Sequence, residues 1–123
     1  MKKLVALILL SFFTTVCGQV DANEYERIFS SENVLVDVRT PSEYLYDHLD
    51  KAVNIPFDKI ESEIKYYAPN KEQTIVVYCE SGSRARMAQK KLEEMGYTNV
   101  INAGKFRELK AAEEKLNKSI AVK

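Results

Sequence analysis

Two short apolar runs constrain the fold of this chain more than any other feature. Val34–Val38 is apolar apart from Asp37, and Thr74–Tyr78 is rich in the β-branched and aromatic residues that favour strands. Runs of this length with few polar breaks are typical of strands that are covered on both faces in a parallel sheet. The two runs therefore predict an α/β protein in which helices flank a mostly parallel sheet.

Helical patterns alternate with these strands. Apolar spacing, capping residues and prolines predict five helices, at residues 21–30, 41–45, 57–67, 84–95 and 106–116. Two shorter strands are predicted at residues 52–55 and 100–101, the second followed by a turn at Ala103–Gly104. In the second helix we expect Tyr44 and Leu45 to point inward. The sheet should then contain four or five mostly parallel strands.

The composition suits a single globular domain without a nucleic-acid partner. The chain has 123 residues, of which 46% are hydrophobic and 29% are charged. Lysine and arginine total 18, as do aspartate and glutamate, so no basic field is present to attract a polyanion.

The first residues have the pattern of an export signal. Two lysines precede the apolar run Leu4–Phe13, and small or polar residues follow it. The run is shorter than the roughly 20 residues that span a bilayer as a permanent helix, so we expect cleavage rather than anchoring. The prediction is a signal peptide over residues 1–18, a single domain over residues 19–123, and a periplasmic or other extracytoplasmic location.

Cys17 leaves an alternative open. A cysteine just after the apolar run can be the lipidated first residue of a lipoprotein, which would anchor the protein to a membrane. The preceding residues Thr14–Val16 match the usual approach to such a site poorly. Cleavage after Gly18 would instead remove Cys17 and leave Cys79 as the sole thiol, so that no disulfide could form within the chain.

Cys79 is the candidate for chemistry. It follows the strand Thr74–Tyr78, at the edge where open α/β sheets bind their ligands. The next residues lead through Gly82 into a helix, so backbone N–H groups, the helix dipole and Arg84 should all favour a thiolate. From these features alone, a buried and inert cysteine stays open as an alternative.

Other chemistries have less support in the sequence. The chain has one histidine, His48, and no Cys-His spacing of a protease or metal site. Ser81 and Ser83 lack the Gly-x-Ser-x-Gly pattern and a second histidine that could serve as a base. We therefore expect neither a metal nor a cofactor.

Two motifs resemble those of the rhodanese family. Cys79–Arg84, with a glycine three residues and an arginine five residues after the cysteine, is similar to the active-site loop of that family. A second signature lies upstream in the same order and spacing: Asp37-Val38-Arg39, Glu43-Tyr44, His48, Ala52 and Asn54-Ile55-Pro56. The resemblance extends from about Asp21 to Leu109 and implies a rhodanese-like three-layer fold.

Three positions depart from the family pattern. Asp47 and Lys51 stand where glycines are usual, around the segment that contains His48. Phe106 lies near the place where a tryptophan is common. These departures concern a surface loop and a packing position rather than the cysteine itself.

The resemblance implies a sulfurtransferase that carries a sulfane sulfur on Cys79 as a persulfide. The donor would be thiosulfate or another small sulfur-containing anion, or a persulfide, and the acceptor would be a thiol or cyanide. The loop would bind the donor through Glu80, Ser81, Gly82, Ser83 and Arg84. We expect the Glu80 side chain to point to solvent.

The remaining motif residues are interpreted as structural support. Asp37 would sit at a strand end, Arg39 would pair with Asp37 or with Glu43, and His48 would fix a turn. Arg86 should leave the helix on a different side from Arg84, and its role stays open.

Two other functions are considered. Cysteine phosphatases and arsenate reductases also hold an oxyanion in a loop between cysteine and arginine, but the phosphatase signature has five intervening residues and this loop has four. The shorter loop fits a sulfur atom better than a tetrahedral oxyanion. A non-catalytic interaction module, or a persulfide carrier for one protein partner, is the alternative from a different class.

Overall fold

The computed structural model describes residues 22–122. Four parallel strands form one sheet in the order β2-β1-β3-β4. The strands are β1 Val34–Asp37, β2 Val53–Asn54, β3 Ile75–Cys79 and β4 Val100–Lys105. The prediction of four or five mostly parallel strands is confirmed, with four strands that are all parallel.

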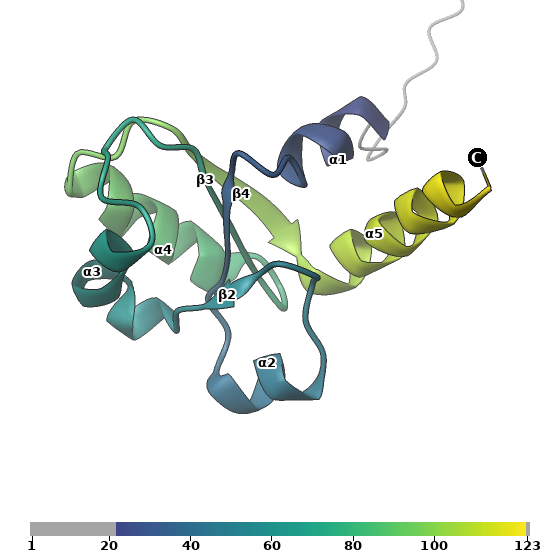
Figure 1. The fold of residues 1–123 in the computed structure, drawn as a ribbon. Helices are drawn as coiled ribbons and strands as arrows, with labels where there is room; N and C mark the ends of the chain where they lie inside the picture. Colours follow the sequence, from purple (N-terminus) through teal and green to yellow (C-terminus); the bar gives the residue numbers. More distant parts are fainter. Residues whose placement is uncertain (1–21, 123) are drawn as a thin grey trace, which may run out of the picture.

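Helices cover both faces of the sheet, as Figure 1 shows. They are α1 Ala22–Ile28, α2 Pro41–Tyr46, α3 Ile60–Glu63, α4 Ser83–Glu94 and α5 Phe106–Ala121, with short 3-10 turns η1 Phe57–Lys59 and η2 Ile64–Tyr66 on either side of α3. The α3 and α4 helices pack on one face, whereas α1 and α5 lie on the other. The predicted three-layer α/β fold is therefore confirmed.

The central strand β3 shows why the apolar runs are uninterrupted. All five of its residues are buried, and its side chains alternate between two core clusters. Val77 and Cys79 point to the α4 face, while Val76 and Tyr78 point to the α5 face. A strand between two helical layers has both faces buried and therefore no place for polar side chains. As the last residue of β3, Cys79 lies in the core between the sheet and α4.

The second helix begins as predicted, but one of its side chains does not point inward. Thr40 caps α2 and forms a capping box with Glu43. Tyr44 packs against the core and donates a hydrogen bond of 2.6 Å from its hydroxyl to the carbonyl oxygen of Ala52. Leu45 is 79% exposed. Successive helical residues differ by about 100° in direction, so a short helix that rests on Tyr44 leaves its neighbour in solvent.

The last strand is longer and less regular than the sequence predicted. Strand β4 runs through to Lys105, and the predicted turn at Ala103–Gly104 is instead an irregularity within the strand. There the register shifts, so that Gly104, with φ of +85°, pairs with Tyr78. The side-chain oxygen of Asn102 accepts a hydrogen bond of 2.8 Å from the Gly104 N–H, which stabilises this bulge locally.

Two helices differ from the prediction in continuity or by more than two residues. The helix predicted over residues 57–67 is divided into the successive pieces η1, α3 and η2, although Ile60 and Ile64 are fully buried as their spacing indicated. Helix α5 extends to Ala121, about a turn past the predicted end, because no glycine or proline stops it.

The predictions about the start of the chain lie outside the described residues. They are the signal peptide over residues 1–18, the alternative of a lipidated Cys17, and residue 21 as the start of the first predicted helix. Within residues 22–122, no helix has the length and apolar character needed to cross a membrane.

Candidate active site

Cys79 is the last residue of β3 and lies beneath the start of α4. Its Sγ accepts a hydrogen bond of 2.9 Å from the Gly82 N–H and another of 3.3 Å from the Ala85 N–H. The residue has no exposed surface and belongs to the apolar core on the α4 face. Two backbone N–H groups at the start of the helix therefore point at one sulfur, and such donors favour a thiolate over a thiol.

The loop between Cys79 and α4 is shaped by Gly82. This residue precedes α4 in the left-handed region, with φ of +93°, which costs glycine little and other residues more. Its carbonyl oxygen accepts hydrogen bonds from the Arg86 N–H at 3.0 Å and from the side-chain amide of Asn102 at 3.4 Å. The loop is therefore held by its own helix and by β4.

The two serines of the loop lie on its outer side. Ser81 and Ser83 are exposed, and their hydroxyl oxygens are 2.9 Å apart. Glu80 follows Cys79 directly, and its side chain is 52% exposed, in line with the expectation that it points to solvent. Its carboxylate also lies 3.5 Å from the Arg39 guanidinium.

Arg84 forms a two-point ion pair with Glu43 of α2. The guanidinium donates one hydrogen bond of 2.8 Å and one of 3.0 Å to the two carboxylate oxygens. This pairing, together with hydrogen bonds from Thr40, lowers the pKa of the Glu43 carboxyl to about 2. The pKa of Arg84 is raised, chiefly by Glu43 and further by the nearby charge of Cys79. The sequence did not predict this pair.

Asp37 and Arg39 form a buried ion pair at the end of β1. Both oxygens of Asp37 accept hydrogen bonds from the Arg39 guanidinium, at distances of 2.7 to 3.0 Å. Arg39 also donates to the carbonyl oxygen of Asp47 at 2.6 Å. Of the two partners that the sequence left open for Arg39, Asp37 is the one observed, while Glu43 binds Arg84 instead. The buried charges are fully hydrogen-bonded, as stability requires.

His48 lies in the turn after α2. Its ring stacks on the Tyr44 ring with centroids 3.9 Å apart, and its Nδ1 is 2.8 Å from the Tyr44 carbonyl oxygen. The His48 carbonyl oxygen accepts a hydrogen bond of 3.0 Å from Lys110 of α5. These contacts are those of a residue that fixes a turn.

Further residues support the site without having been assigned a role from the sequence. The side-chain amide of Asn54 donates to the carbonyl oxygens of Asp37 and Arg39, both at 3.0 Å. The Arg39 guanidinium carbon lies over the Phe106 ring, 4.0 Å from the ring centroid. Asn54 is part of the upstream motif, so the sequence did indicate that it belongs near the site. The stacking of Phe106 on Arg39 depends on the fold and has no local signal in the sequence. Arg86 is exposed.

A hollow of about 310 Å³ adjoins the start of α4. Arg84 and Lys59 line it together with Asp58 and Phe57. Phe57 also packs against the core cluster that contains Cys79, so the hollow opens on the same face of the sheet as the thiol. A small anion entering it would meet two cationic side chains and one carboxylate.

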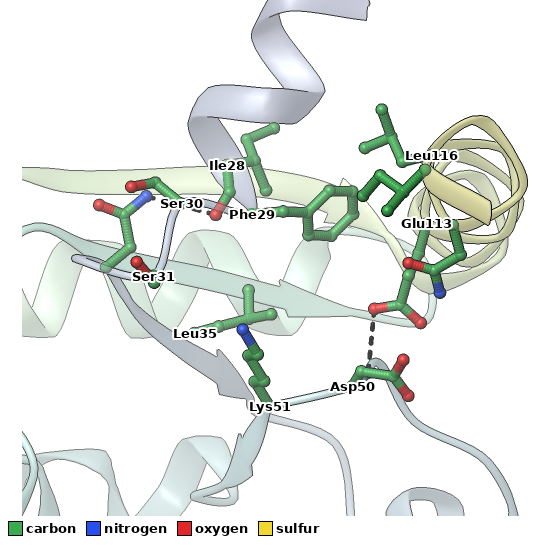
Figure 2. A pocket seen from close by; sticks show the side chains of 12 residues that line it. Ile28, Phe29, Ser30, Ser31, Leu35, Asp50, Lys51, Glu113 and Leu116 are labelled. Carbon is green, nitrogen blue, oxygen red and sulfur yellow. Dashed lines mark hydrogen bonds between the residues drawn. The ribbon is translucent and has the colours of Figure 1, made fainter. Parts of the chain in front are cut away.

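Figure 2 shows another hollow, of about 420 Å³, on the other face of the sheet. It lies between α1 and α5 and is lined by Phe29, Leu35 and Leu116, with Glu113 at one side. Glu113 accepts a hydrogen bond of 2.9 Å from the Asp50 N–H, and burial raises its pKa. None of the predicted site residues lines this hollow, so it is separate from the candidate active site.

Within residues 22–122, no cluster of three or more His, Cys, Asp or Glu side chains is arranged to hold a metal ion.

Comparison with known proteins identifies the family. A model of the rhodanese-like domain matches residues 21–112. Thiosulfate sulfurtransferase PspE of Escherichia coli is 38% identical over 82 residues, which cover 67% of this chain and 78% of that protein. A sulfurtransferase of Allochromatium vinosum is 35% identical over 78 residues, which cover 63% of this chain and 71% of that protein.

Solved structures agree with these relatives. A rhodanese from E. coli, described with anions, superposes with a TM-score of 0.60 and 39% identity over 61% of this chain and 88% of that chain. The human single-domain sulfurtransferase TSTD1 superposes with a TM-score of 0.56 and 31% identity over 63% of this chain and 80% of that chain. A non-catalytic interaction module is not favoured by relatives with these names. The chain therefore belongs to the rhodanese-like domain family, as its two motifs predicted, and its enzymatic class is that of a sulfurtransferase.

Proposed function

We propose that Cys79 is the nucleophile of this sulfurtransferase and carries the transferred sulfur as a persulfide. The observation that carries the proposal is the pair of N–H donors, from Gly82 and Ala85, at 2.9 and 3.3 Å from the Cys79 Sγ. These donors are fixed before any substrate arrives, so they stabilise a thiolate without reorganisation.

The proposed cycle is a double displacement. The Cys79 thiolate attacks the outer sulfur of thiosulfate, the bond between the two sulfur atoms of thiosulfate breaks, and sulfite leaves with the bonding electron pair. The enzyme then holds Cys–S–S⁻. An acceptor thiolate or cyanide attacks the outer sulfur and restores the Cys79 thiolate. No general base is needed, because no hydroxyl group has to lose a proton.

The loop Glu80–Arg84 is proposed to bind the outer sulfur of the persulfide and the donor anion. Backbone N–H groups at the start of α4 would stabilise its negative charge, and Arg84 would orient the donor. Because Cys79 has no exposed surface, a donor reaches its sulfur only after the residues around it move. Gly82 lies at the centre of the loop.

Asp37, Arg39, Glu43 and His48 are proposed to act through position rather than by contact with the transferred sulfur. Their hydrogen bonds connect the end of β1, the helix α2 and the turn that follows it. This framework places Glu43 against Arg84 at the mouth of the loop.

The nucleophile is tested by incubating the purified protein with thiosulfate and measuring its intact mass. We expect the gain of one sulfur atom, reversed by cyanide with release of thiocyanate. In the uncleaved full chain, Cys79→Ser should abolish the gain, whereas Cys17→Ser, the matched change at the other cysteine, should retain it. An unmodified wild-type protein, or a Cys79→Ser variant that still gains sulfur, would refute the assignment.

We further propose that the enzyme works outside the cytoplasm, with residues 1–18 as a cleaved signal and residues 19–123 as the single mature domain. The support is the pattern of two lysines, an apolar run and small residues at the start of the sequence. The mass of the protein recovered from the soluble extracytoplasmic fraction should match a chain that begins at Gln19. A membrane-bound product with a lipid mass on Cys17 would instead establish the lipoprotein alternative.

A further inference from the structure

Glu43 and Arg84 meet across two separate helices at the mouth of the active-site loop. The guanidinium contacts both carboxylate oxygens, at 2.8 and 3.0 Å, and the two side chains are 32% and 27% exposed. Two parallel hydrogen bonds in a partly buried place hold the arginine in one orientation. The charge that Arg84 presents to an incoming anion is therefore largely compensated.

Glu43 is fixed from its own helix as well. Its Oε1 accepts hydrogen bonds from the Thr40 hydroxyl at 3.0 Å and from the Thr40 N–H at 3.3 Å. The bond from the Thr40 N–H is one half of the capping box at the start of α2. Since the pKa of Glu43 is lowered to about 2, chiefly by Arg84, the carboxylate stays ionised whenever the enzyme is folded near neutral pH. The negative charge is a permanent part of the site.

The other charges near the loop do not restore a strong positive field. Arg84 shares one hollow with Lys59 and Asp58, a cation and an anion. Glu43 and Glu80 line a second hollow, where the other charged side chains are again of both signs: Arg39, Asp47, Arg107, Lys110 and Glu114. Glu80 follows the nucleophile and lies 3.5 Å from Arg39, whose charge is already paired with Asp37. A donor with two negative charges would meet more repulsion here than at a site with an uncompensated arginine.

We infer that Glu43 is a specificity-determining residue: by compensating Arg84, it makes the site favour sulfane-sulfur donors with at most one negative charge over dianionic thiosulfate. The inference rests on the proposed persulfide chemistry of Cys79 and names its preferred substrate class. Such donors are alkyl thiosulfonates and the persulfides of small or peptidyl thiols.

Two donors of nearly equal shape separate charge from size. Thiosulfate carries two negative charges, and methanethiosulfonate, in which a methyl group replaces one oxygen, carries one. In both reactions the Cys79 thiolate bonds to the outer sulfur. The bond between that sulfur and the oxidised sulfur breaks, and sulfite or methanesulfinate leaves with the electron pair.

The test compares kcat/KM for the two donors in the wild type and in Glu43→Gln. Glutamine keeps an oxygen for the Thr40 hydrogen bonds, so the capping box is preserved while the charge is removed. We expect the ratio of kcat/KM for thiosulfate to that for methanethiosulfonate to rise about fivefold, the size expected for one unit charge at close range in a water-like dielectric. Thiosulfate turnover by the variant should also fall more steeply with added salt than wild-type turnover.

Glu94→Gln is the matched control, because it removes the same charge from an exposed residue at the far end of α4. Its donor ratio should equal that of the wild type. An unchanged or lower ratio in Glu43→Gln, including an equal loss with both donors, would overturn the inference and leave Glu43 with a purely structural role. Failure of the wild type to form a persulfide with either donor would instead refute the proposed function itself.

Discussion

Lys51 has a backbone conformation that suits glycine better. Its φ is +64°, and among residues 22–122 it is the only residue other than glycine with a positive φ. The left-handed region costs a residue with a side chain about 1–2 kcal/mol. The resemblance to rhodaneses places a glycine at this position, so the departure seen in the sequence corresponds to local strain in the structure.

Replacing Lys51 with glycine should therefore stabilise the protein. We expect the free energy of unfolding to rise by about 0.5–1 kcal/mol, because relief of the left-handed strain exceeds the extra chain entropy of glycine. Lys51→Ala removes the same side chain but keeps the strain, and it should give no such gain. Urea unfolding of the three proteins measures the difference, and a Lys51→Gly protein no more stable than Lys51→Ala would contradict the expectation.

The sequence predicted which residues gather at the site better than it predicted their partners. The position of Cys79 follows from the end of a β-prone run, and Gly82 and Arg84 follow it at fixed spacing. The partner of Arg84 depends on how α2 lies relative to α4, which no local pattern determines. Arg39 could be paired from its nearness to Asp37 in sequence, whereas Glu43 and Arg84 are 41 positions apart.

At the level of elements, a glycine with a positive φ lies at each end of α4, and only the first of the two contacts the active-site cysteine. Gly82 precedes α4 with φ of +93°, and Gly96 follows it with φ of +98°. A Cβ on Gly82 would lie 3.7 Å from the Gly104 Cα, an ordinary contact, and a Cβ on Gly96 would meet nothing within 4 Å. Alanine at either place is therefore penalised mainly by its backbone conformation.

We expect Gly82→Ala and Gly96→Ala each to lower the free energy of unfolding by about 1–2 kcal/mol. Only Gly82→Ala should slow persulfide formation, because the Gly82 N–H donates to the Cys79 Sγ and its conformation aims that bond. Stopped-flow measurement of persulfide formation, beside urea unfolding, distinguishes the two effects. Equal rates in both variants would show that the loop conformation does not control the reactivity of the thiol.

Elements with strong local signals were predicted well, and those determined by neighbouring strands were not. The start of α2 at residue 41 and the bounds of α4, predicted as 84–95, both followed from local patterns in the sequence. The length of β4 could not be predicted in this way, because Asn102 and Gly104 are poor strand formers. They belong to a strand only because they pair with β3. The bulge between them follows from that pairing.

On the scale of the whole molecule, α5 is attached to the sheet by its first turns. Leu109 is 1% exposed and belongs to the core cluster on the α5 face, whereas residues 118–122 are exposed. Leu109→Ala should lower the free energy of unfolding by about 2–5 kcal/mol, since it leaves a cavity in the core. A chain that ends at Asn117 should lose less than about 1 kcal/mol and keep its persulfide formation.

Thermal and urea unfolding of these two variants provide the comparison. If the shortened chain lost as much stability as Leu109→Ala, the last turns of α5 would have to hold the layers together through the hollow that Ile120 lines.

The layered arrangement itself was predictable, because alternating strands and helices with apolar strands permit few other architectures. The order of the strands was not, since a parallel sheet of four strands can be connected in several ways.

The double use of Glu43 has a consequence for how the enzyme can evolve. The same carboxylate caps α2 through Thr40 and compensates Arg84 in α4, so most replacements would harm the helix before they altered the chemistry. Glutamine is an exception, and its codons differ from those of glutamate by one base. A lineage could therefore exchange one donor preference for another through a single point mutation, without passing through a poorly folded ancestor.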